Sequence, residues 1–248
     1  MTIALNYPHD TRSHEPLQLS KRDIWRLAED ARSQAGGSKK LKLNFTDLAV
    51  KARRLRINGL ELETRWEFVP GVHDERGHSV LGAIEYDPAV QRTALVYLNS
   101  AELAEREDIT RSTAAHELAH AIFDAPGWAR QCDRLAAETL EPTIRFRSVV
   151  RRYRSPSSVG ISEWRANEFM GAFLAPPNLL RREMLKVLSR LSLPRGYNAD
   201  GLPVIDTRRL GPYQVQAVAD ELAEGFGLSI AFIEYRLHRY GFAPETDK

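Results

Sequence analysis

Residues 114–123 read AAHELAHAIF and lie near the middle of the 248-residue chain. Five apolar side chains in this stretch have the spacing of one buried helix face: Ala115, Leu118, Ala119, Ile122 and Phe123. His116 and His120 lie one position round from that face and stack one turn apart along its edge. The stretch therefore predicts a buried helix that presents two imidazoles on the same side.

Two imidazoles in this arrangement can bind one Zn²⁺ ion, for which neutral imidazole is a good ligand. Glu117 points away from the pair but can reach a water at the metal, where a carboxylate serves as general base. The pattern HExxH also arises by chance, and His116 and His120 would then be two helix histidines without a metal. This stretch alone leaves both interpretations open.

A second stretch, residues 162–177, reads SEWRANEFMGAFLAPP and predicts another helix, which the two prolines end. Its buried face is formed by Ala166, Phe169, Met170 and Phe173. Glu163 and Asn167 share an adjacent edge, while Glu168 lies too far round the helix to face the same metal. Because a catalytic zinc takes a third protein ligand, often a glutamate, we expect Glu163 to bind it and Asn167 to hydrogen-bond to a ligand histidine. The alternative is that Glu163 is simply an acidic residue in a first turn, where the helix dipole favours it.

Composition is that of a globular protein, with 43% hydrophobic and 27% charged residues and a net charge of only +2. The single cysteine, Cys132, excludes an internal disulfide framework and fits a reducing compartment. No apolar run reaches the roughly 18 residues of a membrane span. The N-terminal residues 1–16 contain no apolar segment of signal-peptide length. We therefore expect a cytoplasmic protein that does not contact the membrane.

The order of elements predicts an α+β fold. Helical patterns cover 20–35, 45–57, 109–123, 129–140, 163–175, 178–191, 212–227 and 230–241. Short segments rich in β-branched and aromatic residues predict strands at 62–69, 79–86 and 93–99. Helices, then strands, then helices indicate an α+β chain with an antiparallel or mixed sheet, and we expect a small, twisted, mostly antiparallel one.

Three parts are expected along the chain. Residues 1–44 form an N-terminal extension with one helix, 45–192 form the core, and 193–248 form a helical part packed on it. The stretch 193–212 is rich in proline and glycine and predicts a linker or a surface loop.

The two helical stretches together resemble the ImmA/IrrE family of bacterial zinc metallo-endopeptidases. The resemblance rests on HELAHAIFD at 116–124 and EWRANEFMGAFLAPP at 163–177. The strand segment TALVYLNS at 93–100 and the closing segment 223–242 are also similar to that family. The resemblance implies a gluzincin-like fold, with a small sheet packed on the helix that carries HExxH.

The same resemblance implies a mechanism and a partner. It implies Zn²⁺ bound by His116, His120 and Glu163, with Glu117 as general base. It further implies that the chain cleaves a helix-turn-helix transcriptional repressor and so derepresses genes of stress, DNA damage or anti-phage defence.

Two features depart from the family pattern. The interval between His120 and Glu163 is long, which leaves an extra segment at about 125–160. The C-terminal helix pair over 212–241 has the size of a DNA-binding motif. Its second helix, however, carries apolar residues that indicate packing rather than base contacts: Ile230, Phe232, Ile233 and Leu237.

Peptide hydrolysis also needs a donor for the oxyanion and a place for the substrate. Tyrosines are candidates for the donor, and the sequence does not choose among Tyr97, Tyr153, Tyr235, Tyr240 and the remaining histidines. An extended substrate adds to a sheet edge by main-chain hydrogen bonds, and we expect 79–86 to form that edge.

A basic segment lies within the extra region. Its arginines are Arg145, Arg147, Arg151, Arg152 and Arg154. Interleaved with Phe146 and Tyr153, they suit phosphate contact and base stacking, so single-stranded DNA is a candidate activator. A solvated basic face, or a docking patch for an acidic substrate, is the alternative that the composition favours.

Cys132 lies twelve residues beyond His120 on the same extra segment. A thiolate binds zinc strongly, so one hypothesis places Cys132 in the fourth zinc position as an inhibitory ligand. The alternative is a small buried side chain that packs with its neighbours.

Two rival functions remain open. One is a non-catalytic regulator on a protease fold, in which zinc is structural; Glu117 argues against it, because a structural site needs no general base. The other is a nucleic-acid sensor or binding module in which HExxH is incidental, which the pairing of the two helical stretches disfavours.

Overall fold

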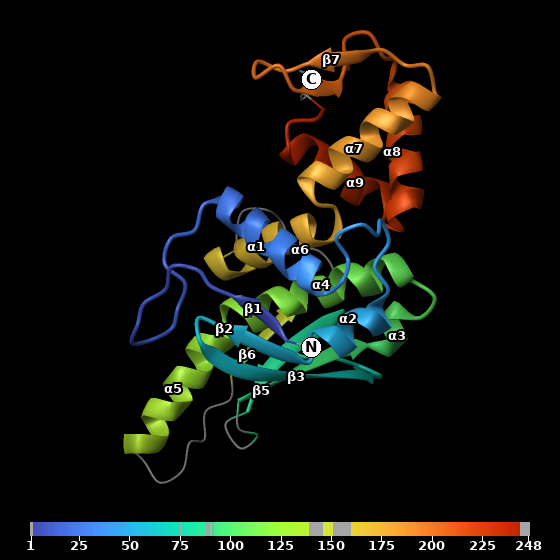
Figure 1. Cartoon of the computed structure of the whole chain (residues 1–248). Coiled ribbons are helices and arrows are strands. Elements are labelled where there is room, and N and C mark those ends of the chain that lie inside the picture. Colours follow the sequence, from blue (N-terminus) through green and yellow to red (C-terminus); the bar gives the residue numbers. More distant parts are fainter. Residues whose placement is uncertain are drawn as a thin grey trace. The chain divides into compact units, whose positions relative to one another are not determined.

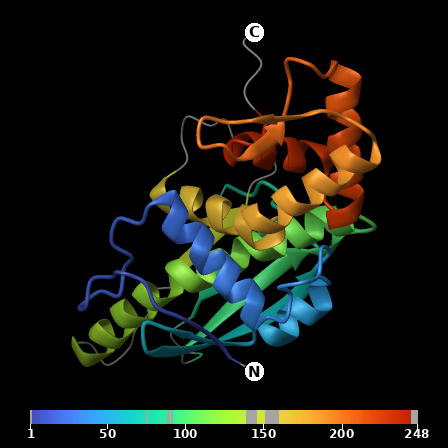
Figure 2. The same cartoon turned by 45° about the horizontal axis from the view of Figure 1, so that its top comes forward.

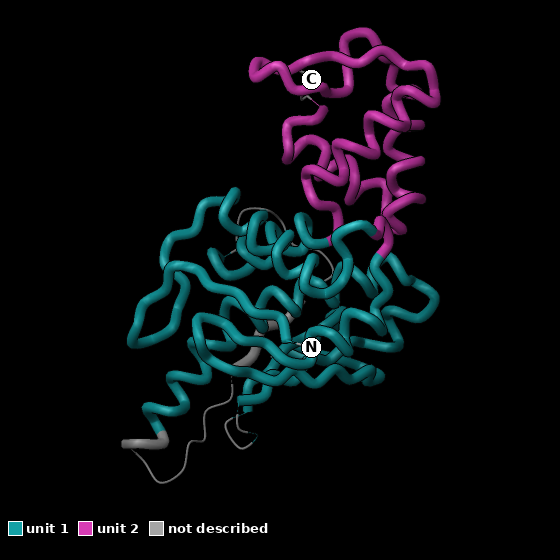
Figure 3. Tube along the Cα trace, viewed as in Figure 1, with its two compact units in different colours: residues 1–39, 43–173 teal, residues 40–42, 174–248 magenta. Residues whose placement is uncertain are grey.

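A computed structural model describes residues 2–74, 76–87, 90, 92–138, 146–150 and 160–243, with only the backbone path given for 136–138 and 146–150. The chain divides into two compact units (Figure 3). Unit 1 comprises Met1–Lys39 and Leu43–Phe173, and unit 2 comprises Lys40–Lys42 and Leu174–Lys248. Among the described residues, no helix is long and apolar enough to cross a membrane.

Unit 1 contains a mixed sheet (Figure 1). Its strands are β1 (Ile3–Leu5), β2 (Arg54–Ile57), β3 (Leu60–Val69), β4 (Gly82–Tyr86), β5 (Thr93–Asn99) and β6 (Phe146–Val150). Their order across the sheet is β1-β2-β3-β5-β4-β6. The β1–β2 and β3–β5 pairs are parallel, and the β2–β3, β4–β5 and β4–β6 pairs are antiparallel. The α+β class is therefore confirmed, and the sheet is mixed.

The prediction that residues 79–86 form the sheet edge to which the substrate adds is wrong. β4 lies inside the sheet, because β5 pairs along one side and β6 along the other. The β6 register runs from Gly82 opposite Val150 to Tyr86 opposite Phe146, so it covers the whole of β4.

The helices of unit 1 are α1 (Lys21–Gln34), α2 (Phe45–Lys51), α3 (Ser100–Leu103), α4 (Glu107–Phe123), α5 (Ala125–Glu138) and α6 (Ile161–Leu174), the last of which ends at the first residue of unit 2. The predicted start of α1 is confirmed, since Ser20 forms a capping box with Asp23. The predicted helix over 45–57 is only half correct. It ends at Lys51, and Arg54–Ile57 forms β2, in which alternate residues are buried.

α4 is the central helix of unit 1 (Figures 1 and 2). It packs on β4 and β5, and every residue from Thr113 to Phe123 is buried. On its other side, the ring of Phe123 meets the ring of Phe169 on α6 edge-on, with centroids 5.7 Å apart. A helix buried on all sides fits the small and apolar residues of the stretch 114–123.

Side chains of α1 form hydrogen bonds with α6. Its buried Arg32 donates hydrogen bonds to the carbonyl oxygens of Phe173 and Gly37, and Trp25 Nε1 donates to Glu168 Oε2 at 2.7 Å. These hydrogen bonds satisfy polar groups whose burial without a partner would cost free energy.

Unit 2 is mainly helical. It contains α7 (Pro177–Arg190), the hairpin β7 (Arg195–Tyr197) and β8 (Pro203–Ile205), α8 (Pro212–Phe226) and α9 (Ile230–Arg239). The stretch 193–212 thus carries a small hairpin. Gly227 adopts φ +64° between α8 and α9, a conformation that glycine reaches without strain. Ile233 and Leu237 of α9 are buried, as the apolar pattern indicated, whereas Phe232 is half-buried and Ile230 is exposed.

Candidate metal centre

α4 brings His116 and His120 together. Their ring centroids are 4.8 Å apart, and the two Nε2 atoms are 3.0 Å apart. The His116 side chain is 5% exposed and the His120 side chain is fully buried. The i, i+4 spacing on a regular helix explains why both rings point to the same place.

Glu163, in the first turn of α6, completes the group. Its Oε2 lies 3.4 Å from His116 Nε2, and its Oε1 lies 3.7 Å from His120 Nε2. The candidate ligand atoms of the three residues lie within 4.8 Å of one another. At 20% exposure, the Glu163 side chain is the most exposed of the three.

The spacing of these donors fits one ion. Two ligands about 2.0–2.1 Å from a tetrahedral metal lie about 3.3 Å apart. The observed separations of 3.0, 3.4 and 3.7 Å fall around that value. Two nitrogen donors and one carboxylate suit a borderline divalent metal, and a set of three protein ligands leaves a position for another ligand. The residues therefore fit a metal site.

Asp124, directly after α4, was missed in the sequence. Its Oδ2 accepts a hydrogen bond of 2.6 Å from His120 Nδ1, which leaves the lone pair of Nε2 on the side of the group. Burial raises the pKa of Asp124, but the hydrogen bonds and charges of His120, Ser162 and Arg165 outweigh it and hold that pKa low. The available signal was its position in HELAHAIFD, four residues after His120.

The two histidines differ in their electrostatics. Burial lowers the pKa of His116, and hydrogen bonds with Glu163 and Asn167 oppose that effect without overcoming it. Burial also lowers the pKa of His120, but Asp124, by its hydrogen bond and its charge, raises it overall. Asn167 thus contacts His116, the kind of partner expected of it.

Glu117 lies on α4 between the histidines and is fully buried. Its charge acts on His120 and raises the pKa of that ring. A Cβ atom built on Gly82 would stand 3.1 Å from Glu117 Oε1, so the carboxylate lies against the start of β4.

Cys132 lies elsewhere. It is buried on α5, near Tyr86 and Asp87 at the end of β4 opposite to Gly82. Burial raises the pKa of its thiol, which disfavours the thiolate that binds metal. Within the described part of the chain, the metal group contains no cysteine, so the structure does not place Cys132 at a fourth position.

The basic segment lies largely outside the described residues. This holds for Arg145, Arg151, Arg152 and Arg154, and Arg147 lies in β6, where only the backbone is described. Of the candidate oxyanion donors, Tyr153 is also outside, Tyr97 packs against Val72, Val80 and Ala83, and Tyr235 and Tyr240 belong to unit 2.

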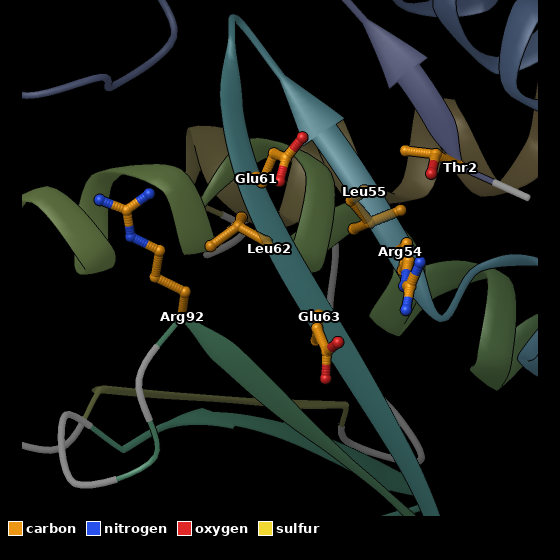
Figure 4. Close-up of a pocket in the computed structure, with 7 residues that line it drawn as sticks. All are labelled: Thr2, Arg54, Leu55, Glu61, Leu62, Glu63 and Arg92. Atoms are coloured by element: carbon orange, nitrogen blue, oxygen red, sulfur yellow. The ribbon is translucent and has the colours of Figure 1, made fainter.

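A separate pocket of about 490 Å³ lies between β2, β3 and the residue before β5 (Figure 4). It is lined by Thr2, Arg54, Leu55, Glu61, Leu62, Glu63 and Arg92. Its lining has no imidazole or thiol and includes no member of the metal group.

Fold and site together define an α+β chain with a candidate His/His/Glu metal centre built on an HExxH helix. No protein-family model matches the chain, and neither a curated protein nor a solved structure matches it. The class of the site therefore rests on its geometry.

Proposed function

We propose that this chain is a zinc-dependent endopeptidase of the ImmA/IrrE type. The observation that carries the proposal is the convergence of His116 and His120 with Glu163 from a helix more than forty residues away, beside the buried carboxylate of Glu117. A chance HExxH gives no reason for a third ligand to arrive from a distant helix.

The roles of the residues follow from their positions. His116, His120 and Glu163 would hold the ion, and Asn167 and Asp124 would orient the two imidazoles. Zinc held there would supply Lewis acidity, which would acidify a water and polarise a peptide carbonyl. Glu117 removes the proton from the attacking water and returns it to the leaving amine. Its place against Gly82 limits the orientations that its carboxylate can adopt.

The proposed substrate is a helix-turn-helix repressor, whose cleavage would switch on stress, DNA-damage or phage-defence genes. This partner follows from the resemblance of residues 116–124 and 163–177 to the family. The arginine-rich segment 145–154 makes single-stranded DNA a candidate activator, while its composition favours a solvated basic face or a docking patch for an acidic substrate.

The experiment is co-expression of the chain with a candidate helix-turn-helix repressor, followed by detection of the fragments. We expect wild type to cleave and Glu117→Gln to lose at least about 100-fold in rate, because a general base contributes roughly that much or more. Glu117→Gln should retain its zinc, since Glu117 is not a ligand. Glu107→Gln, an exposed change on the same helix, is the matched control and should cleave normally. Cleavage that survives in Glu117→Gln would refute the mechanism.

A second function, a non-catalytic regulator with a structural metal, is favoured by one observation. Glu117 is completely buried and His116 and His120 nearly so, which suits a site that only holds an ion. Under this function, wild type binds zinc with the three ligands, yet wild type and Glu117→Gln both leave the repressor intact.

A further inference from the structure

We propose that Asp124 is the positioning residue of the metal centre, and that it couples the second histidine ligand to the carboxylate ligand on α6. This inference rests on the proposed metal site. It adds to that site the statement that the contributions of His120 and Glu163 to metal binding depend on each other through Asp124.

One carboxylate oxygen carries the coupling. Asp124 Oδ2 accepts one hydrogen bond from His120 Nδ1 at 2.6 Å and another from the hydroxyl of Ser162 at 2.6 Å. Ser162 immediately precedes Glu163, so the same atom contacts the ring of one candidate ligand and the side chain of the residue next to another. The Ser162 Oγ atom also lies 3.4 Å from His120 Nδ1, so the three groups form a compact cluster.

The other carboxylate oxygen holds Asp124 itself in place. Arg165 Nη2 donates to Oδ1 at 3.1 Å, and both side chains are nearly buried, at 12% and 11% exposed. The guanidinium of Arg165 also lies over the ring of Phe123, 5.9 Å from its centroid. A charge-assisted pair in such a place is strong and directional, so Asp124 has little freedom to turn away from His120.

The C-terminal end of α4, which carries Asp124, makes further contacts of its own. Asp124 is the C-cap of α4, and its N–H donates to the carbonyl of His120. Tyr7, from the N-terminal segment, donates its hydroxyl to the carbonyl of Ile122 at 2.8 Å and packs its ring 5.4 Å from that of Phe123. Segments from three distant parts of the sequence thus meet behind His120.

A purely structural aspartate would contribute to folding but would not couple two ligands. The distinguishing quantity is the affinity for Co²⁺, a zinc substitute whose visible absorption reports the ligand set. A double-mutant cycle on Asp124→Asn and Glu163→Gln measures whether the two residues act on the ion together.

We expect Asp124→Asn to weaken Co²⁺ binding about 10- to 100-fold and to change the visible spectrum, because loss of the partner of a ligand histidine has that effect. In the Glu163→Gln background, the same change should weaken binding clearly less, since part of its effect passes through Glu163. Ser162→Ala should weaken binding in the same direction by a smaller factor. Asp133→Asn, a half-exposed aspartate on α5, is the control and should match wild type.

Two results would overturn the inference while leaving the metal centre intact. One is Asp124→Asn binding Co²⁺ as tightly as wild type, and the other is a strictly additive cycle. Thermal unfolding of the metal-free variants shows whether each is folded, and if Asp124→Asn is not, the cycle is run with Ser162→Ala in its place. Failure of wild type to bind Co²⁺ would instead refute the proposed metal site, and this inference with it.

Discussion

At Gly82 the absence of a side chain leaves room for Glu117. A Cβ at this position would stand 2.7 Å from Thr113 Cγ2, 3.1 Å from Glu117 Oε1 and 3.3 Å from the carbonyl oxygen of Tyr97. The first distance is shorter than non-bonded carbon atoms tolerate, and Gly82 lies in a strand paired on both sides. Glycine is therefore required here by close approach rather than by backbone conformation.

Under the proposed endopeptidase function, Gly82→Ala should keep its metal and lose activity. The added methyl group pushes against Thr113 and the Glu117 carboxylate, and displacement of a catalytic group by about 1 Å costs on the order of 100-fold. We expect unchanged zinc content and a cleavage rate lowered about 10- to 100-fold. Gly225→Ala is the control, since its nearest neighbour would lie at an ordinary contact distance of 3.7 Å. A fully active Gly82→Ala would show that Glu117 does not depend on this space.

At this scale, the sequence predicted the candidate ligands better than the side chains that hold them in place. His116 and His120 follow from helical spacing, and Glu163 follows from its edge of a second helix and from the family resemblance. Asp124 lies four residues after His120 and on the same edge, so its hydrogen bond to that ring was within reach of the same argument. Its contacts with Ser162 and Arg165 were not, because they depend on how α4 and α6 pack.

Among the elements, α1 shows local signals that determine a boundary. Ser20 Oγ accepts from the N–H of Asp23 at 3.2 Å, and the Asp23 carboxylate accepts from the N–H of Ser20 at 3.2 Å. These two bonds satisfy groups that helix geometry leaves unpaired, which is why the start of α1 was readable from the sequence.

Ser20→Ala should lower the free energy of unfolding by about 1 kcal/mol, because it removes the side-chain cap. Ser33→Ala, an exposed change in the last turn of α1, should leave that free energy unchanged or slightly higher. Urea titrations of the two variants beside wild type provide the comparison. Equal midpoints for Ser20→Ala and Ser33→Ala would mean that the cap contributes nothing.

Elements that depend on neighbours distant in sequence were harder to predict. Leu48, Ala52 and Leu55 have helical spacing, yet Leu55 belongs to β2, where it pairs with Leu62 of β3. β1 has three residues, too few to show a period, and it exists because it adds in parallel to β2. In both cases a strand partner, rather than local propensity, determines the structure.

For the whole molecule, the α+β class followed from the order of helices and strands, but the sheet order did not. The parallel β3–β5 pair and the placement of β6 beside β4 depend on long connections that leave no local pattern. The boundary between the two units is also not marked by a pattern in the sequence. It falls at Phe173 and Leu174, within one continuous α6.

The candidate metal centre lies entirely in unit 1, since α4 and the start of α6 both belong to it. The central claim is that one ion joins these two helices. Anomalous diffraction from crystals grown with zinc, collected on both sides of the zinc absorption edge, tests it most directly. We predict one strong peak at bonding distance from His116 Nε2, His120 Nε2 and the Glu163 carboxylate. A peak at another place, or no peak between the three residues in crystals that contain zinc, would contradict the claim.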